Sequence, residues 1–162
     1  MTSKVERAPL VFGRTTFAED IRNEASGQFT MVGVYPGGIH LPSFPATIAK
    51  FAFMVEFQQR TDASDEDVRL AAFAPGSEAD QPVWEIILPA ASFDAGPPEA
   101  LVDDERKSTY PGELVHRQIQ LVVMASLQIE QPGMFQIRAF RAGKIWGLGG
   151  LHFIRADQVP QP

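Results

Sequence analysis

The chain has 162 residues, a formal charge of −6 and no cysteine. That length fits one domain with a full hydrophobic core, and the missing cysteines exclude disulfides, thiolate catalysis and zinc–thiolate or iron–sulfur sites. Net acidity with scattered Lys and Arg argues against nucleic-acid binding. No apolar run approaches the length of a signal peptide or a membrane span. We therefore expect one soluble cytoplasmic domain over residues 1–162, with 1–13 and 156–162 as loose tails.

The first half of the chain predicts short strands separated by turns. We expect a strand at 15–24, a two-residue turn at Ser26-Gly27 and a returning strand at 28–35. A short strand at 39–41 is broken by nearby prolines, which cannot donate to a sheet ladder. A core strand follows, since large apolar residues alternate with smaller or more polar ones. These apolar residues are Phe51, Phe53, Val55 and Phe57.

The second half continues the same pattern. Strands are expected at 68–74 and 83–88, followed by a long connection at 89–113 in which 99–107 has some helical character. A second strong alternation then predicts one buried face on a single strand, made of Ile119, Leu121, Val123, Ala125, Leu127 and Ile129. Two tight turns, at Pro132-Gly133 and Ala142-Gly143, frame the last two strands.

Seven to nine short strands with little helix predict an all-β domain. We expect an antiparallel two-sheet sandwich of the Ig-like or C2-like kind, because each of the two strongest strands shows one apolar face. A barrel is the alternative architecture.

Several of these residues together resemble a family of small uncharacterised bacterial and phage-associated proteins. The resemblance rests on the strand Asp20-x-Arg22-x-Glu24-x-x-Gly27, on Gly33-Val34-Tyr35 and on Phe44-Pro45. It covers about residues 15–60, and the hairpin that begins at Pro132-Gly133 is similar to the closing hairpin of that family. The resemblance implies a β-sandwich of unknown function and brings no activity, cofactor or site residue.

An acidic run is the sharpest candidate for a metal site. Asp62, Asp65, Glu66 and Asp67 supply oxygen ligands of the kind that calcium prefers, and Asp103-Asp104-Glu105 would contribute only if the two loops converge. The EF-hand spacing is absent. The alternative, which we favour, is a solvated turn, so no metal and no cofactor is expected.

A charged stripe on the first strand is the candidate binding surface. Asp20, Arg22 and Glu24 share one face of that strand, with Arg22 placed to pair with either acid. The alternative is edge-strand protection, in which charges discourage sheet-to-sheet aggregation.

No residue set predicts catalysis. The three histidines lie far apart, the nucleophile-elbow and phosphate-loop motifs are missing, and Glu19 and Asp20 point to opposite faces of a strand. We expect a non-enzymatic binding or assembly module that acts through a protein partner or a second copy of itself, without nucleic acid or membrane. The alternatives are a small-ligand or calcium-dependent carbohydrate-binding sandwich and, less favoured, a carboxylate-based hydrolase.

Overall fold

The computed structural model describes residues 11–60, 66–78, 81–90 and 115–158, and everything below refers to these residues. They are all-β with almost no helix: eleven strands form three sheets, and one 3-10 turn spans Ala156–Gln158. The strands are β1 (Val11–Asn23), β2 (Phe29–Val34), β3 (Gly38–Leu41), β4 (Ala46–Ile48), β5 (Phe51–Arg60), β6 (Val68–Phe73), β7 (Trp84–Leu88), β8 (Val115–Met124), β9 (Leu127–Ile129), β10 (Gly133–Arg141) and β11 (Lys144–Arg155).

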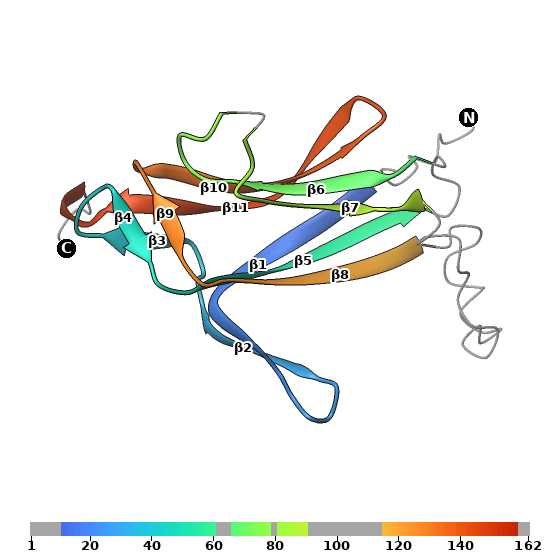
Figure 1. Ribbon diagram of the computed structural model, residues 1–162, viewed down its shortest axis with the longest axis horizontal. Coiled ribbons are helices and arrows are strands. Elements are labelled where there is room, and N and C mark those ends of the chain that lie inside the picture. Colours follow the sequence, from blue (N-terminus) through green and yellow to red (C-terminus); the bar gives the residue numbers. More distant parts are fainter. Residues whose placement is uncertain (1–10, 61–65, 79–80, 91–114, 159–162) are drawn as a thin grey trace, which may run out of the picture.

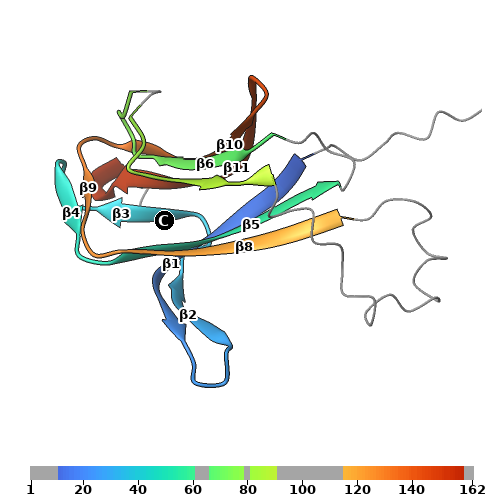
Figure 2. The same ribbon diagram turned by 45° about the vertical axis from the view of Figure 1, so that its right-hand side comes forward.

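Two large sheets lie face to face in a sandwich-like arrangement (Figures 1 and 2). The four-stranded sheet has the order β2-β1-β5-β8, and the five-stranded sheet has the order β3-β11-β10-β6-β7. A small third sheet, β4-β9, lies at one end. The pairing of β3 with β11 is parallel, whereas the other described pairs are antiparallel. This order leaves β8 at an edge of the four-stranded sheet.

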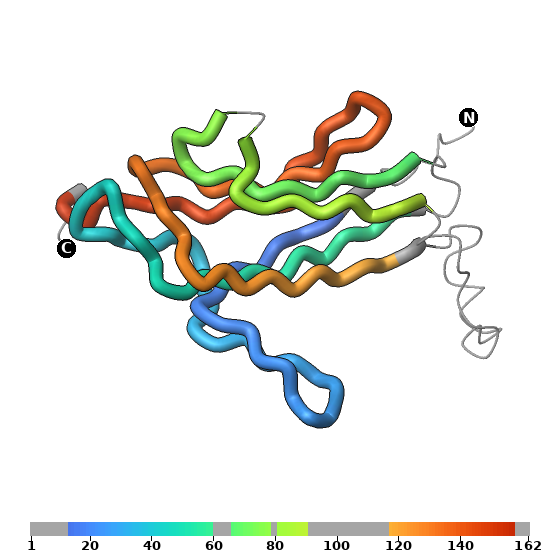
Figure 3. Tube along the Cα trace, viewed as in Figure 1, coloured from blue at the N-terminus to red at the C-terminus, as the bar shows by residue number. Residues whose placement is uncertain are grey.

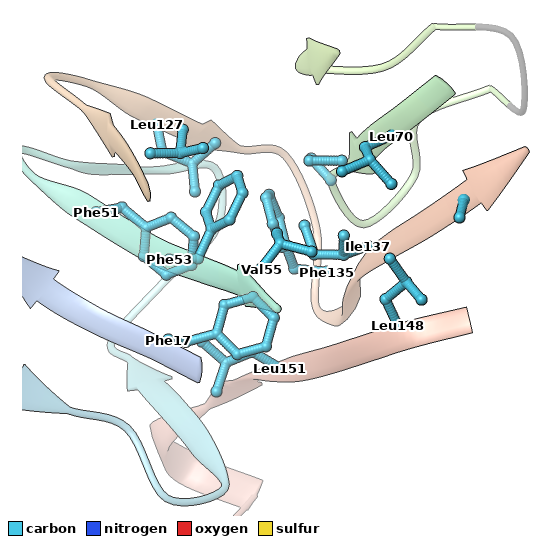
Figure 4. Packing of buried hydrophobic residues seen from close by; sticks show 14 of the residues in the cluster. Phe17, Phe51, Phe53, Val55, Leu70, Leu127, Phe135, Ile137, Leu148 and Leu151 are labelled. Carbon is cyan, nitrogen blue, oxygen red and sulfur yellow. The ribbon is translucent and has the colours of Figure 1, made fainter. Parts of the chain in front are cut away.

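The core lies between the two large sheets and is rich in phenylalanine (Figure 4). Phe17 and Phe51 from the four-stranded sheet meet Phe135 from the opposite sheet, with ring centroids 6.1 and 5.2 Å away respectively. Phe53 and Phe153 complete the aromatic group. The alternation that predicted a buried face on β5 is confirmed. All four of its predicted core residues, Phe51, Phe53, Val55 and Phe57, are fully buried.

The prediction for residues 119–129 is wrong in two respects. The segment forms two strands, β8 and β9, separated by a bend after Met124, rather than one strand. Leu127 and Ile129 enter the core as expected, but Ile119, Leu121 and Val123 point to the outside of the four-stranded sheet. On β8 it is Val122 that is buried.

Two smaller boundaries and the number of strands also differ from expectation. Residues 11–13, expected in a loose lead-in, belong to β1, where Gly13 pairs with Phe57. The first hairpin closes with three loop residues, 25–27, rather than two, since Glu24 N–H donates to Gln28 O at 2.8 Å. The strand count is eleven rather than seven to nine. The turn at Ala142-Gly143 is confirmed, with both residues at positive φ between paired strand ends.

The two halves of strand β1 pair with different strands. Its residues 11–18 pair with β5 inside the sandwich, whereas from Ala18 onward it pairs with β2. The hairpin of residues 19–33, called the arm below, leaves the sandwich and projects beyond the four-stranded sheet (Figures 1 and 3). Residues 22–30 are all exposed. The arm is therefore a protrusion with few core contacts of its own.

Candidate binding surface

The outer face of the four-stranded sheet carries an exposed apolar stripe. Its members, Ile119, Leu121 and Val123 of β8, retain between 37% and 47% of their surface exposed. They are called the β8 stripe below. Across the sheet, Leu121 pairs with Met54, which is half-buried and extends the stripe toward β5, whereas Val123 pairs with Ala52, which is fully buried. Soluble proteins normally cover or charge such edges, because exposed apolar edge strands promote association.

A buried carboxylate lies at one end of the β8 stripe. Glu56 of β5 is opposite Ile119, and its side chain is only 7% exposed although it faces away from the core. Its Oε2 accepts from Arg14 Nη2 at 3.1 Å and lies 3.0 Å from Arg117 Nη2. Gln58 Nε2 donates to Oε1 at 2.8 Å. Two exposed guanidinium groups thus flank one carboxylate, which leaves this end of the sheet with a positive charge.

The pKa of Glu56 reflects two opposing causes. Burial acts to raise the pKa, because the charged form loses hydration. Hydrogen bonds from Gln58, Arg14 and Arg117 outweigh burial and hold the pKa of Glu56 below its ordinary value of 4.5. Glu56 is therefore ionised at neutral pH and keeps the two arginines close together across three strands.

Of the three residues in the predicted charged stripe, the structure brings Asp20 and Arg22 together and leaves Glu24 with a different partner. Asp20 is buried and accepts from Arg22 Nε at 3.1 Å, as the sequence suggested, but its other oxygen lies 2.6 Å from Lys50 Nζ. Glu24 is in the hairpin loop region and accepts from Thr30 Oγ1 at 2.8 Å instead of pairing with Arg22. Hydrogen bonds from Lys50 and then Arg22 lower the pKa of Asp20 from its ordinary 3.8.

Asp20 thus ties the base of the arm to the sandwich, because Lys50 immediately precedes β5. The arm as a whole is acidic: Glu19, Asp20 and Glu24 against Arg22 leave residues 19–33 with a formal charge of −2. The outer side of the four-stranded sheet therefore has an acidic projection, an apolar stripe and a basic end.

Little of the predicted acidic metal site can be placed. Asp62, Asp65 and the 103–105 run lie outside the described residues, as do the helical turns expected at 99–107. Asp67 is described, and its Oδ1 accepts from the backbone N–H of Ala90 at 2.9 Å. Among the described residues no group of three or more His, Cys, Asp or Glu side chains is placed to hold a metal ion. The hydrogen bond between Ala90 and Asp67 links the start of β6 to the end of β7, so Asp67 has a structural role.

Comparisons with known proteins leave this geometry without a named relative. No family model, no curated protein and no solved structure matches the chain. In the described part of the chain, no helix is long and apolar enough to cross a membrane.

The sequence pattern predicts this apolar face but places it on the inner side of the sheet. Ile119, Leu121 and Val123 were correctly grouped on one face, but that face is outside. The inner face of β8 carries Gln118, Gln120 and Val122. In the sequence, Glu56 is one polar residue of an alternating strand. Its partners Arg14 and Arg117 come from strands that are distant in the sequence, so no local sequence pattern predicts the cluster.

Proposed function

We propose that the chain is a non-enzymatic assembly module that binds a second copy of itself through the outer face of the β2-β1-β5-β8 sheet. The observation that carries the proposal is the β8 stripe, with its exposed Ile119, Leu121 and Val123 between oppositely charged regions. A cytoplasmic location, a β-sandwich of the Ig-like or C2-like kind and the resemblance to the uncharacterised bacterial family are parts of the same proposal.

The charge arrangement favours a second copy over an unrelated partner. A two-fold interface uses the same surface on both subunits, and it places one end of that surface against the other end of its copy. Such a surface is self-complementary when its two ends carry opposite charges. Here the acidic arm and the Arg14–Arg117 end flank the β8 stripe. A two-fold axis through the stripe would place each arm near the basic end of its partner, with apolar contacts at the centre.

The apolar contribution has the size expected of a reversible dimer. Burying what remains exposed of an Ile, Leu or Val side chain at this level contributes about 1 kcal/mol. Three such residues on each copy give about 6 kcal/mol per dimer. The charged ends add specificity and salt dependence, while the cost of association subtracts from the total. Since about 6 kcal/mol corresponds to a dissociation constant of about 40 μM before the cost of association is subtracted, the expected constant lies between tens and hundreds of micromolar.

Sedimentation equilibrium from about 5 to 500 μM tests the proposal. The wild-type chain is expected to dimerise, and Leu121→Glu is expected to weaken the dimer at least tenfold by placing carboxylates at the interface. Ile87→Glu is the matched control, because Ile87 is also an exposed apolar residue on an edge strand but lies in the other sheet. A second prediction is that 0.5 M NaCl weakens the wild-type dimer.

Three results would overturn the proposal. One is a wild-type monomer at the highest concentration. Another is a dimer that Leu121→Glu leaves intact, and the third is an equal loss of dimer in both variants. Circular dichroism of each variant checks that it is folded, so loss of dimer is not confused with loss of structure.

A further inference from the structure

The opposite sheet carries a pocket that the proposed assembly does not use. The pocket has a volume of about 290 Å³ and lies on the outer face of the five-stranded sheet, beside the turns at 74–77 and 131–133. Its lining includes Phe73, Gln136 and Arg138 from β6 and β10. This volume is near the lower limit for small-ligand sites, which favours a compact ligand.

One turn hydrogen bond and one close contact between a backbone and a side chain shape the pocket wall. Pro75 and Gly76 form a turn in which Ser77 N–H donates to Ala74 O at 3.0 Å, and Gly76 has a φ of 82°. This φ favours glycine, and a Cβ at Gly76 would lie 2.8 Å from Nε2 of Gln131, whose side chain crosses the turn. These contacts hold the two turns against one another and give the pocket a formed wall.

The charged group of the pocket is Arg138. Its guanidinium carbon is 5.1 Å from the centre of the Phe73 ring, and its Nε donates to Gln136 Oε1 at 3.0 Å. Nη2 donates to the same amide oxygen. Among the described residues, Arg138 has hydrogen bonds to this neutral amide and no ion pair with a carboxylate. None of the described residues that line the pocket is acidic.

A second arginine on the same face of the sheet, Arg69, makes the same kind of ring contact but is paired with a carboxylate. The guanidinium carbon of Arg69 is 5.0 Å from the centre of the Phe140 ring, almost the distance of Arg138 from Phe73. Its Nε donates to Glu85 Oε2 at 2.7 Å. The two arginines therefore share the same stacking but differ in counter-charge, and the one without a described carboxylate partner is the one in the pocket.

We infer that this pocket binds a carboxylate, with Arg138 as the charged recognition group. Arginine presents several N–H donors in a plane, which suits the two oxygens of a carboxylate. Stacking on Phe73 restrains the guanidinium group, so less conformational freedom is lost on binding. The adjacent Pro75, Pro132 and Met134 provide apolar surface for a short hydrocarbon group next to the carboxylate. Both a free carboxylic acid and the C-terminus of a peptide have this chemistry.

NMR titration of the ¹⁵N-labelled full chain tests the inference with three probes: isovalerate, N-acetyl-Gly-Val and N-acetyl-Gly-Val amide. Both acids are expected to shift the amide signals of Ser77 and Gly133 and the Nε–H signal of Arg138, with dissociation constants in the millimolar range. The amide probe is expected to produce no saturable shift. A peptide acid that binds at least tenfold more tightly than isovalerate identifies a chain end as the ligand source, and equal binding identifies a free acid.

Matched variants connect the binding to Arg138. Arg138→Gln is expected to weaken acid binding at least tenfold, whereas Arg69→Gln, which removes the paired arginine on the same face, leaves it within twofold of wild type. The inference is overturned if the amide binds as well as the acid, if no probe shifts these signals at 50 mM, or if the two variants behave alike. Arg138→Lys retains the positive charge and is expected to bind with intermediate affinity. The experiment does not depend on whether the chain dimerises.

Discussion

Replacing Glu56 with glutamine isolates the charge at the centre of the arginine cluster. Glutamine has nearly the same shape as glutamate, and its carbonyl oxygen can still accept from Arg14 and Arg117. The amide of Gln58 can rotate to accept from the new NH₂ group. Glu56→Gln therefore removes the negative charge and leaves the packing and the number of hydrogen bonds almost unchanged.

The exposure of the partners sets the expected magnitude. The Arg14 and Arg117 side chains are 73% and 54% exposed, so water screens both ion pairs and each loses about 0.5 kcal/mol when the carboxylate is neutralised. The Gln58 contact loses a similar amount, about 0.5 kcal/mol, because hydrogen bonds to charged groups are stronger than neutral ones. The expected destabilisation is about 1.5 kcal/mol, well below the roughly 3–5 kcal/mol for breaking a fully buried ion pair.

Equilibrium urea denaturation at pH 7 measures this difference. The matched control is Glu85→Gln, since Glu85 is half exposed and has the single described partner Arg69. That control is expected to cost no more than about 0.5 kcal/mol. A Glu56→Gln effect no larger than that of Glu85→Gln would refute the reasoning, because it would mean that the buried position and extra partners of Glu56 add nothing.

Three further predictions concern acid stability, the core and the arm. The folded-state pKa values of Glu56 and Asp20 are lowered, so both ionised carboxylates stabilise the fold fully above the ordinary carboxyl range, and this stabilisation is lost as pH falls through the folded-state values. Between pH 6 and 2.5, the free energy of unfolding is therefore expected to fall less steeply in the Glu56→Gln, Asp20→Asn double variant than in the wild type. Phe135→Ala is expected to cost about 4 kcal/mol in urea denaturation, because the ring is fully buried among other rings, whereas exposed Phe29→Ala costs below about 1 kcal/mol; similar values would contradict the packing described. Gly33→Ala is expected to cost about 1 kcal/mol, since Gly33 has a φ of 65° and a Cβ there would lie 2.6 Å from Glu19 Cδ; hydrogen exchange should accelerate in the arm and remain unchanged in β10.

Side-chain alternation predicted the core where a strand is covered on one face by the opposite sheet. On β5 the large apolar residues face inward, so periodicity and burial agree. On β8 the same periodicity grouped the right residues but placed them on the wrong side. Alternation establishes which residues share a face. Which of the two faces becomes buried depends on neighbouring strands, and β8 is an edge strand whose inner face includes two glutamines.

The candidate sites were harder to predict because their members come from distant strands. The Glu56 cluster joins β1, β5 and β8, and the Arg138 pocket joins β6, β10 and two turns. The Asp20–Arg22 contact joins neighbouring positions of one strand, and that is the contact the sequence correctly suggested. The β1–β2 hairpin was also predicted, but its departure from the sandwich depends on β1 exchanging partners at Ala18, which strand periodicity does not encode.

The exchange of partners at Ala18 divides β1 into two regions of different stability. Residues before Ala18 pair with β5, whose core side chains are fully buried, so the amide hydrogens that they donate to β5 are expected to exchange only through extensive unfolding of the sandwich. Residues of the arm have one partner strand and almost no buried apolar surface, so they open with a much smaller free energy. A single continuous strand therefore spans a cooperative folding unit and a locally opening one, and the arm is able to unfold and re-form while the core remains intact.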